Sequence, residues 1–207
     1  MSNIKYMEQN TEEWFSARLG KITASSAHNL LVKGNGQTRK SYILRKASEL
    51  ITGVNQDVDL SSNPYVQRGN ELEDEAITMY EAVNLTEVQK VGFFELNKFV
   101  GCSPDGLVGD KGLIEIKCKK TENHLNSIIK GRKGIEPKYY TQMQMQMWIC
   151  DREWCDFVLY HPDFPYEGKY KNLHQIRIER ENGFIEDLKK AIDEGIKEIE
   201  SIVNGEV

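Results

Sequence analysis

The chain of 207 residues has no long apolar run. A helix that crosses a membrane needs about 20 consecutive, mostly apolar residues, and no stretch of this sequence comes near that length. Residues 1–10 also lack the basic segment followed by an apolar segment that is typical of a secretory signal peptide. We therefore expect a protein with no membrane association, located in the cytoplasm.

The sequence also lacks the cysteine patterns that mark metal sites or disulfide frameworks. Its four cysteines, Cys102, Cys118, Cys150 and Cys155, form no Cys-x-x-Cys pair and show no zinc-type spacing. Several of them lie in predicted strands beside apolar neighbours. We expect reduced, buried thiols, and an iron–sulfur cluster is the alternative.

An excess of basic residues is missing as well. The 27 lysines and arginines are outnumbered by 32 aspartates and glutamates, which gives a formal net charge of −5. A protein that coats nucleic acid is usually basic, so this balance argues against that class. It is compatible with an enzyme that gathers acidic side chains around a metal ion and keeps its basic residues in local clusters. Such clusters occur at 39–46, 117–120 and 130–133, and each is also compatible with an ordinary solvated surface.

What the sequence does contain is a compact set of charged residues near its middle. Asp105 lies in a Ser-Pro-Asp-Gly turn, and nine residues separate it from Glu115 in the triplet Glu-Ile-Lys. Carboxylates bind hard cations such as Mg²⁺, and the Lys117 amine can orient or deprotonate a water beside them. The segment therefore predicts a metal-dependent phosphodiesterase site.

Strand alternation supports this grouping. Glu115 and Lys117 are two residues apart and point to one face of a strand, whereas Ile114 and Ile116 point to the other. The apolar flanks predict a well-buried strand, and ionised side chains are rarely buried without partners. The alternative is an exposed strand whose Glu-Lys pair is solvated and follows a routine turn.

The remaining pattern predicts an α+β fold with a central mixed sheet flanked by helices. The segment 141–148 alternates Met and Gln with period two, which favours a strand, but both residue types favour helices and Pro137 can start one. We predict a helix there, with Gln142 and Gln146 on one face.

The other expected helices are 12–19, 22–31, 41–51, 68–83 and 182–203, with an irregular segment at 54–64. The expected strands are a meander of 91–94, 99–102, 107–108 and 113–118, followed by 154–160 and 173–178.

Four motifs in order along the chain resemble a known family. The Asp…Glu-x-Lys pattern at 105–117 resembles the signature of the PD-(D/E)XK nuclease superfamily. The segments WFSARLGKITAS at 14–25, GNELE at 69–73 and YYTQMQ at 139–144 resemble motifs of the lambda exonuclease group, also called YqaJ-like viral recombinases. Together these motifs span 14–148, and the final strands and helix agree by type only.

The resemblance implies a fold and an activity. It implies one PD-(D/E)XK nuclease domain over 1–207 with a restriction-endonuclease-like core: a helical part at about 10–85, a sheet core at about 88–180 and a closing helix at about 182–203. The implied enzyme is a metal-dependent deoxyribonuclease of the alkaline-exonuclease type. It would use Mg²⁺, or Mn²⁺, to degrade one strand of linear double-stranded DNA from 5′ to 3′, releasing 5′-mononucleotides and leaving 3′ overhangs for phage-type recombination. It also implies binding to DNA ends, a homotrimer, a single-strand annealing partner and, for a phage protein, the host cell cytoplasm.

The resemblance also assigns roles to individual residues. It implies that Asp105, Glu115, the Ile116 carbonyl and Glu73 hold the metal, and that Lys117 acts on the attacking water. It implies a binding site for the terminal 5′-phosphate and the scissile end built from Arg18, Ser25, Ser103 and Gln142.

Each assignment has a structural alternative. Arg18 suits a helix C-terminus, where cations are favoured, and Ser25 suits an N-cap. Ser103 is compatible with turn support and Glu73 with a solvated helix face, while Gln144 and Gln146 are alternatives to Gln142. We assign no chemistry to His28, His124, His161 and His174. The competing functions are a PD-(D/E)XK endonuclease and a DNA-end-binding module that has lost its chemistry.

Overall fold

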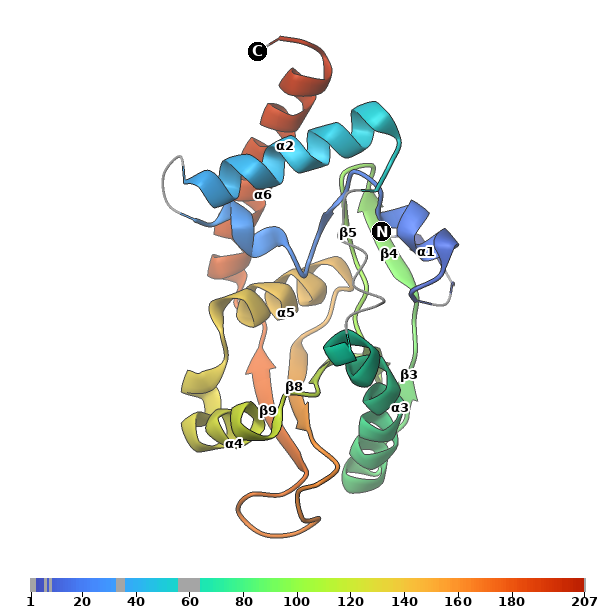
Figure 1. Cartoon of the computed structure of the whole chain (residues 1–207), viewed down its shortest axis with the longest axis vertical. Helices are drawn as coiled ribbons and strands as arrows, with labels where there is room; N and C mark the ends of the chain where they lie inside the picture. The colour runs from blue at the N-terminus through green and yellow to red at the C-terminus, as the bar shows by residue number, and fades with distance from the viewer. Residues whose placement is uncertain (1–2, 6, 8, 33–35, 56–63, 207) are drawn as a thin grey trace.

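The computed structural model describes residues 3–5, 7, 9–32, 36–55 and 64–206, with the backbone alone at 3–5, 64–67 and 70 (Figure 1). The predicted irregular segment therefore lies outside the described residues over 56–63. The helices are α1 (Glu12–Arg18), α2 (Gln37–Thr52), α3 (Pro64–Asn84), α4 (Thr121–Lys130), α5 (Pro137–Ile149) and α6 (Asn182–Val203), with 3₁₀ turns η1 (Ala27–Leu30) and η2 (Gly131–Gly134). The strands are β1 (Asn3–Lys5), β2 (Ile22–Thr23), β3 (Val88–Gln89), β4 (Phe93–Asn97), β5 (Val100–Cys102), β6 (Gly106–Val108), β7 (Gly112–Lys117), β8 (Trp154–Tyr160) and β9 (Leu173–Glu179).

The strands form two sheets, and the α+β class is as predicted. The five-stranded sheet has the order β3-β6-β7-β8-β9 and is mixed, because β7 and β8 run parallel while the other pairs are antiparallel. The second sheet has the order β1-β4-β5-β2. The predicted single meander was wrong at one point: β5 and β6 do not pair, and the chain passes from one sheet to the other between Cys102 and Gly106.

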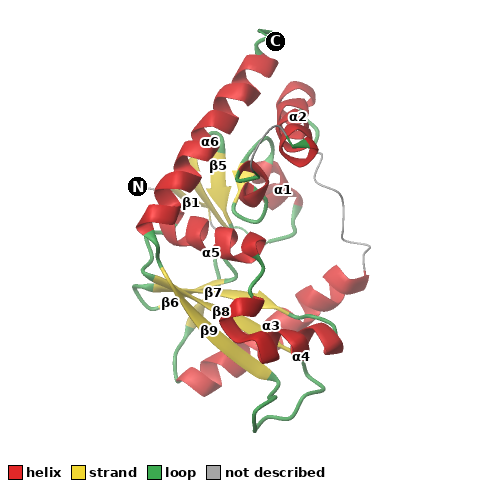
Figure 2. Cartoon of the chain, turned by 90° about the vertical axis from the view of Figure 1, so that its left-hand side faces the viewer, coloured by secondary structure: helices red, strands yellow, loops and turns green. Residues whose placement is uncertain are grey.

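Helices cover both faces of the five-stranded sheet. Ile114 and Ile116 on β7 pack against α3, in a cluster with Leu72, Ala76 and Tyr80. Leu113, on the opposite face of the strand, joins the larger core that contains the α5 methionines. Figure 2 shows α5 lying between the two sheets, with α6 and α2 above it. The alternation predicted for β7 is therefore confirmed.

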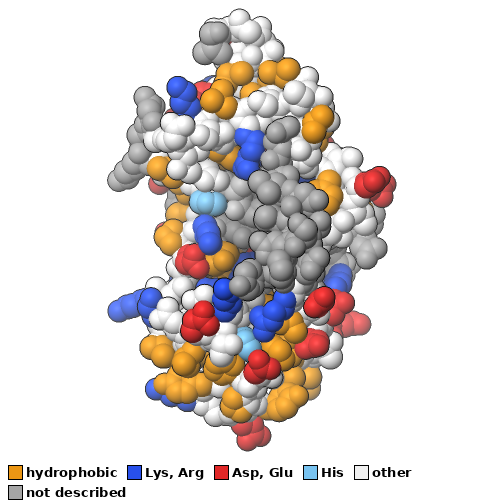
Figure 3. All heavy atoms as spheres, viewed as in Figure 1, with side chains coloured by type: hydrophobic (Ala, Val, Ile, Leu, Met, Phe, Trp, Pro, Cys, Tyr) orange, Lys and Arg blue, Asp and Glu red, His pale blue; other side chains and the backbone are white. Residues whose placement is uncertain are grey.

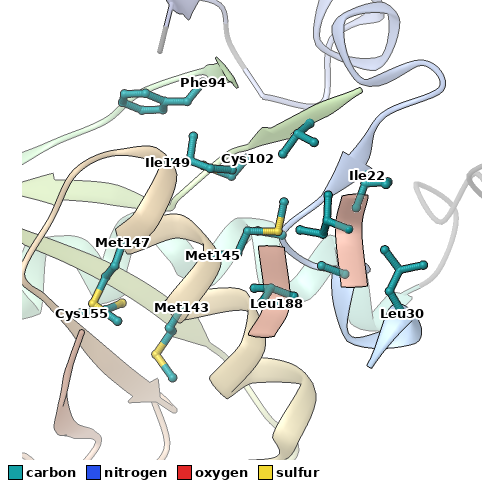
Figure 4. Close-up of a cluster of buried hydrophobic side chains, with 14 of the residues drawn as sticks. Ile22, Leu30, Phe94, Cys102, Met143, Met145, Met147, Ile149, Cys155 and Leu188 are labelled. Atoms are coloured by element: carbon teal, nitrogen blue, oxygen red, sulfur yellow. The ribbon is translucent and has the colours of Figure 1, made fainter. Parts of the chain in front are cut away.

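Helix α5 is buried on nearly all sides, which explains its ambiguous sequence. Met143, Met145, Met147, Gln144 and Gln146 are all fully buried. Figure 4 shows Met147 beside Cys155 of the five-stranded sheet, while Met145 points the other way, towards Leu188 and Ile22. A helix enclosed on all sides has no polar face, so a 3.6-residue period does not emerge from its sequence. The predicted helix is confirmed, and Pro137 is its first residue.

Short or polar elements account for the differences from prediction. Ile22 and Thr23 were expected in a helix but form β2, which runs parallel to β5. Helix α4 was missed because it buries only His124, Ser127 and Ile128 in an otherwise polar segment. The strands β1 and β3 were also missed, and α2 begins four residues before the expected start. Two- and three-residue strands depend on distant partners and carry little pattern of their own.

The cysteines are free thiols. Cys102 and Cys155 are buried, while Cys118 and Cys150 are half-buried. The sulfur atoms of Cys102 and Cys150 lie 3.6 Å apart. No helix among the described residues is both long and apolar enough to cross a membrane.

A buried ion pair anchors α2 to the segment that follows α1. The Lys46 ammonium lies 3.0 and 2.9 Å from the two Glu49 oxygens, and both side chains are fully buried. Glu49 Oε2 also accepts a hydrogen bond from the Gly20 amide at 2.9 Å. Removing one charge of such a buried pair costs more than the pair contributes when it is intact.

We therefore expect Glu49→Ala to lower the free energy of unfolding by about 3–5 kcal/mol. The double variant Lys46→Met/Glu49→Leu removes both charges and should lose less than the single variant. Urea unfolding followed by circular dichroism measures the difference. Lys111→Ala, which breaks the exposed pair with Glu153, is the control and should cost less than about 1 kcal/mol. A Glu49→Ala loss no larger than that control would contradict the prediction.

Candidate active site

Asp105 links the connection between the two sheets to strand β7. Its Oδ2 accepts a hydrogen bond from the backbone amide of Ile116 at 2.6 Å. Gly106 pairs with Ile114 in the antiparallel β6–β7 ladder, so Asp105 and Glu115 are the next pair in register. A Cβ on Gly106 would lie 2.3 Å from a Val88 methyl, so glycine permits the close approach that places Asp105 here.

Glu115 is a fully buried carboxylate with a partner on each oxygen. Its Oε1 accepts a hydrogen bond from Gln142 at 2.7 Å and also contacts the Lys117 ammonium. Its Oε2 accepts from Gln146 at 2.8 Å. Gln142 and Gln146 are one helical turn apart on α5 and both point at β7, as the shared face predicted. Gln146 was foreseen only as an alternative to Gln142, whereas both donate to this carboxylate.

Lys117 places a cation among the oxygens that were predicted to hold a metal. Its Nζ contacts Glu115 and donates to the Ile116 carbonyl at 3.0 Å. Burial lowers the pKa of Lys117, but the neighbouring carboxylates of Glu115 and Asp105 outweigh burial and raise it. The carboxylates of Glu115 and Asp105 thus already favour a positive charge beside them. Oxygen ligands of this kind fit a divalent cation.

The other two acidic residues are electrostatically part of the same group. Burial, followed by the charge of Glu115, raises the pKa of Asp105 well above its usual range. Burial likewise raises the pKa of Glu73, with Glu115 acting in the same direction and Lys90 and Lys117 opposing it. Crowded, desolvated carboxylates of this kind are stabilised by a bound cation. Among the described residues, no three His, Cys, Asp or Glu side chains lie close enough together to hold a metal ion. The cation that contacts Glu115 in this structure is the Lys117 ammonium.

Arg18, Trp14 and Ser103 form a second group joined to the first. Trp14 Nε1 donates to Ser103 Oγ at 2.8 Å, and the Arg18 guanidinium stacks on the Trp14 ring, 4.0 Å from its centre. The Ser103 carbonyl accepts a weak bond from Gln146 Nε2 at 3.4 Å, so the chain of contacts runs from α1 to Glu115. Trp14 was not foreseen as a site residue, although its position in the same motif as Arg18 was the available signal.

Ser25 lies apart from that group. It is exposed, and its hydroxyl is 3.4 Å from the Thr23 hydroxyl. Ser26, not Ser25, occupies the N-cap position of η1, although it makes no side-chain capping bond, so the N-cap alternative for Ser25 was wrong. The Ser26 hydroxyl is hydrogen-bonded to the Thr23 hydroxyl at 3.0 Å and to the buried Tyr42 hydroxyl at 2.9 Å. These three hydroxyl groups form a hydrogen-bonded series next to Ser25 in the chain. Among the described contacts, none joins Ser25 to Arg18.

Comparison with known proteins identifies the family of the chain. Residues 13–153, more than half of the chain, match the family described as the YqaJ-like viral recombinase domain. The chain belongs to this family. The predicted family is thereby confirmed, and the matched range contains every predicted site residue.

Solved structures support the family assignment. The YqaJ-like chain is similar to the alkaline exonuclease LHK-Exo from Laribacter hongkongensis, with 36% identity over 94% of this chain and 95% of that chain and a TM-score of 0.84. LHK-Exo in complex with dAMP gives 37% identity and the same TM-score over the same shares of the two chains. A phage-related exonuclease from Haemophilus somnus 129PT, at 23% identity over 90% and 96% of the two chains with a TM-score of 0.69, shares the fold.

A curated viral relative is much longer. An uncharacterized protein of Acanthamoeba polyphaga mimivirus is 25% identical over 173 residues, which cover 76% of the YqaJ-like chain. That stretch is only 30% of the length of the mimivirus protein.

The Glu115 contacts predict that Gln146 supports cation binding at the YqaJ-like site. Gln146→Leu removes the donor to Oε2 and should weaken Mn²⁺ binding by about 10- to 100-fold, the usual effect of losing a partner behind a metal ligand. Gln144→Leu is a matched control, because Gln144 is equally buried on the same helix but bonds to the backbone at Glu179 and Glu181. Isothermal titration calorimetry measures both. Equal affinities in the two variants would contradict the role of Gln146.

Proposed function

We propose that the chain is a Mg²⁺-dependent 5′→3′ exonuclease that removes 5′-mononucleotides from one strand of linear double-stranded DNA and leaves 3′ overhangs. The coarser assignment, a nuclease that acts on DNA, follows from the family and from the 36–37% identity to an alkaline exonuclease over nearly the whole of both chains. The observation that carries the finer proposal is the convergence of Asp105, Glu115 and Lys117 at the connection between the two sheets.

The proposed metal ligands are Asp105, Glu115, the Ile116 carbonyl and Glu73, with Mn²⁺ able to replace Mg²⁺ at the same oxygens. A bound divalent cation would lower the pKa of a water and offset the charge that develops on the phosphoryl oxygens. The chain's own contribution is to present these oxygens in a buried site where Gln142 and Gln146 restrain Glu115. Restrained carboxylates lose less entropy when a cation binds than mobile ones do.

The proposed role of Lys117 is to orient or deprotonate the attacking water. Its amine is tethered between Glu115 and the Ile116 carbonyl, so it reaches the same oxygens as the proposed cation. Asp105 holds the β7 backbone at Ile116 and thereby sets the direction of the Lys117 side chain. Attack of this water on the phosphorus would break the bond to the 3′-oxygen, which would take up a proton from water and leave as a 3′-hydroxyl.

The polarity is proposed to come from a site for the terminal 5′-phosphate. Arg18 presents a planar, permanently charged fork, and stacking on Trp14 holds it in place. Ser103 links this pair to the acidic group, and Ser25 and Gln142 are the further neutral donors proposed for the phosphate and the scissile end. Each cut regenerates a 5′-phosphate at the new end, so the same site serves every cycle. The complex of LHK-Exo with dAMP, a mononucleotide, supports this product class.

The assembly and partners are proposals from the family resemblance. A homotrimer that encircles the DNA would keep the enzyme on its substrate, and a single-strand annealing protein would take up the 3′ overhang for phage-type recombination. We propose that a single nuclease domain over 1–207 performs this work in the cytoplasm, which is that of the host cell if the protein is phage-encoded.

The decisive experiment compares linear duplex DNA bearing 5′-phosphates with a covalently closed circle, each with Mg²⁺ and with EDTA. We expect Mg²⁺-dependent release of 5′-mononucleotides from the linear DNA and an intact circle. Lys117→Ala should reduce hydrolysis at least ~10²-fold, the usual scale of acid–base assistance, while binding to DNA ends survives. Cleavage of the circle would indicate an endonuclease instead. End binding without hydrolysis by the unaltered chain would indicate a module that has lost its chemistry.

Arg18→Ala tests the proposed phosphate site. A hydrogen bond to a charged group contributes about 1.5–3 kcal/mol, so the variant should lose about 10- to 100-fold in kcat/KM on 5′-phosphorylated ends. Ends with a 5′-hydroxyl lack that charge and should lose much less, which makes them the internal control. Initial rates on the two substrates give the ratio. Equal losses on both would remove Arg18 from the phosphate site.

A further inference from the structure

Arg68 of α3 reaches across the carboxyl ends of two parallel strands beside the candidate site. Its Nη2 lies 3.2 Å from His161 Nε2, and its Nη1 is 3.5 Å from the Lys119 carbonyl. Lys117 and Leu159 are paired in the β7–β8 ladder, and Lys119 and His161 are each two residues further along. The guanidinium is therefore held just beyond the strand ends, two residues after Lys117.

The backbone places Arg68 close to the acidic group from two directions. On α3 it lies five residues before Glu73, a proposed metal ligand. At the strand ends its Nη1 contacts the carbonyl of Lys119, two residues after Lys117. A ligand bound at the acidic group would therefore lie in the field of the Arg68 charge.

The contacts of Arg68 are neutral acceptors rather than carboxylates. His161 is almost fully buried, and burial followed by the charge of Arg68 lowers its pKa against the opposing charge of Asp163, which favours the neutral imidazole. Thr121 Oγ1 lies 3.1 Å from the same His161 nitrogen and helps to hold the ring. Among the residues with described side chains, Arg68 forms no ion pair, unlike Arg177 with Asp156 or Arg39 with Glu198. Within the part of the chain that the structure describes, its charge is therefore held in place without a carboxylate partner.

The neighbouring lysine does not duplicate this charge. The Lys119 side chain turns away from Arg68 and contacts Ser127 and Glu136, so only its carbonyl serves the guanidinium. Figure 3 shows several Lys and Arg side chains, with Asp and Glu side chains among them, across the lower half of the face drawn there. An uncompensated, oriented guanidinium is the group best suited to a phosphate oxygen pair.

We propose that Arg68 binds a backbone phosphate of the DNA close to the bond that is cut, and that His161 is a positioning residue that holds the guanidinium for this contact. The inference rests on the proposed function and adds a substrate contact to it. The contact is with the phosphate, so it contributes affinity and register without sequence preference. The alternative is that Arg68 only ties α3 to the strand ends.

The salt dependence of binding separates these two roles. The parent is the full chain with Lys117→Ala, so that the DNA survives, and the probe is a fluorescent 5′-phosphorylated duplex in Mg²⁺. Each phosphate contact adds about 0.9 to the slope of log K against log salt concentration for duplex DNA. We expect Arg68→Ala on this parent to reduce that slope by about 0.9 and to weaken binding equally for unrelated duplex sequences. Anisotropy titrations at about 50 to 200 mM KCl measure the slope.

Matched variants exclude indirect effects. Arg68→Gln removes the charge but keeps amide donors for His161, and it should lose the same slope as Arg68→Ala. Arg68→Lys keeps the charge without the planar fork, so the slope should return while affinity stays below that of the parent. His161→Ala should weaken binding with Arg68 present and have little further effect when Arg68 is already alanine. Arg152→Ala is the control, because Arg152 lies at the opposite, amino ends of β7 and β8 and bonds to Gly109.

The outcomes are distinct. A parent that binds the duplex, with an unchanged slope in Arg68→Gln and Arg68→Ala, would overturn the phosphate contact and leave the proposed function standing. A parent that does not bind duplex ends would overturn both. A slope that falls equally in Arg152→Ala would show a general charge effect and would also overturn the assignment to Arg68.

Discussion

The structure depends on satisfying one carboxylate, that of Glu115, in a fully buried position. An unpartnered charge at such a depth would cost several kcal/mol, so the surrounding elements must supply donors. Two glutamines reach it from α5 and one ammonium from its own strand. The packing of α5 between the two sheets is therefore tied to this charge, because a rotation or slide of the helix would withdraw both amides.

That requirement explains why the chain changes sheets where it does. The segment that leaves β5 and enters β6 carries Ser103 towards α1 and Asp105 towards β7. If β5 and β6 were paired in one sheet, this segment would be a tight hairpin on one edge. The segment instead connects the two sheets, and its residues contact Trp14 of α1, Gln146 of α5 and Ile116 of β7.

The sequence was sufficient to predict the parts that carry a local pattern. The alternation around Ile114 and Ile116, the composition of α5 and the periodicity of α6 all gave the correct elements, and the Asp105–Glu115 group was found together. The two-sheet arrangement and β2 were missed because they are set by pairings with distant strands, such as Ile22 with Val100. Arg68 and Trp14 gave no separate signal either, since their importance lies in contacts with residues far away in the chain.

Neutral partners help to orient both the negative and the positive groups. Two amides orient the oxygens of Glu115 without cancelling its charge, and the ion pair with Lys117 involves one of these oxygens. Arg68 contacts an imidazole and a carbonyl, which orient its guanidinium. A carboxylate partner at Arg68 would bind the side chain more tightly but would leave less charge for a phosphate. Orientation by neutral groups therefore suits the metal and phosphate contacts that we propose side by side.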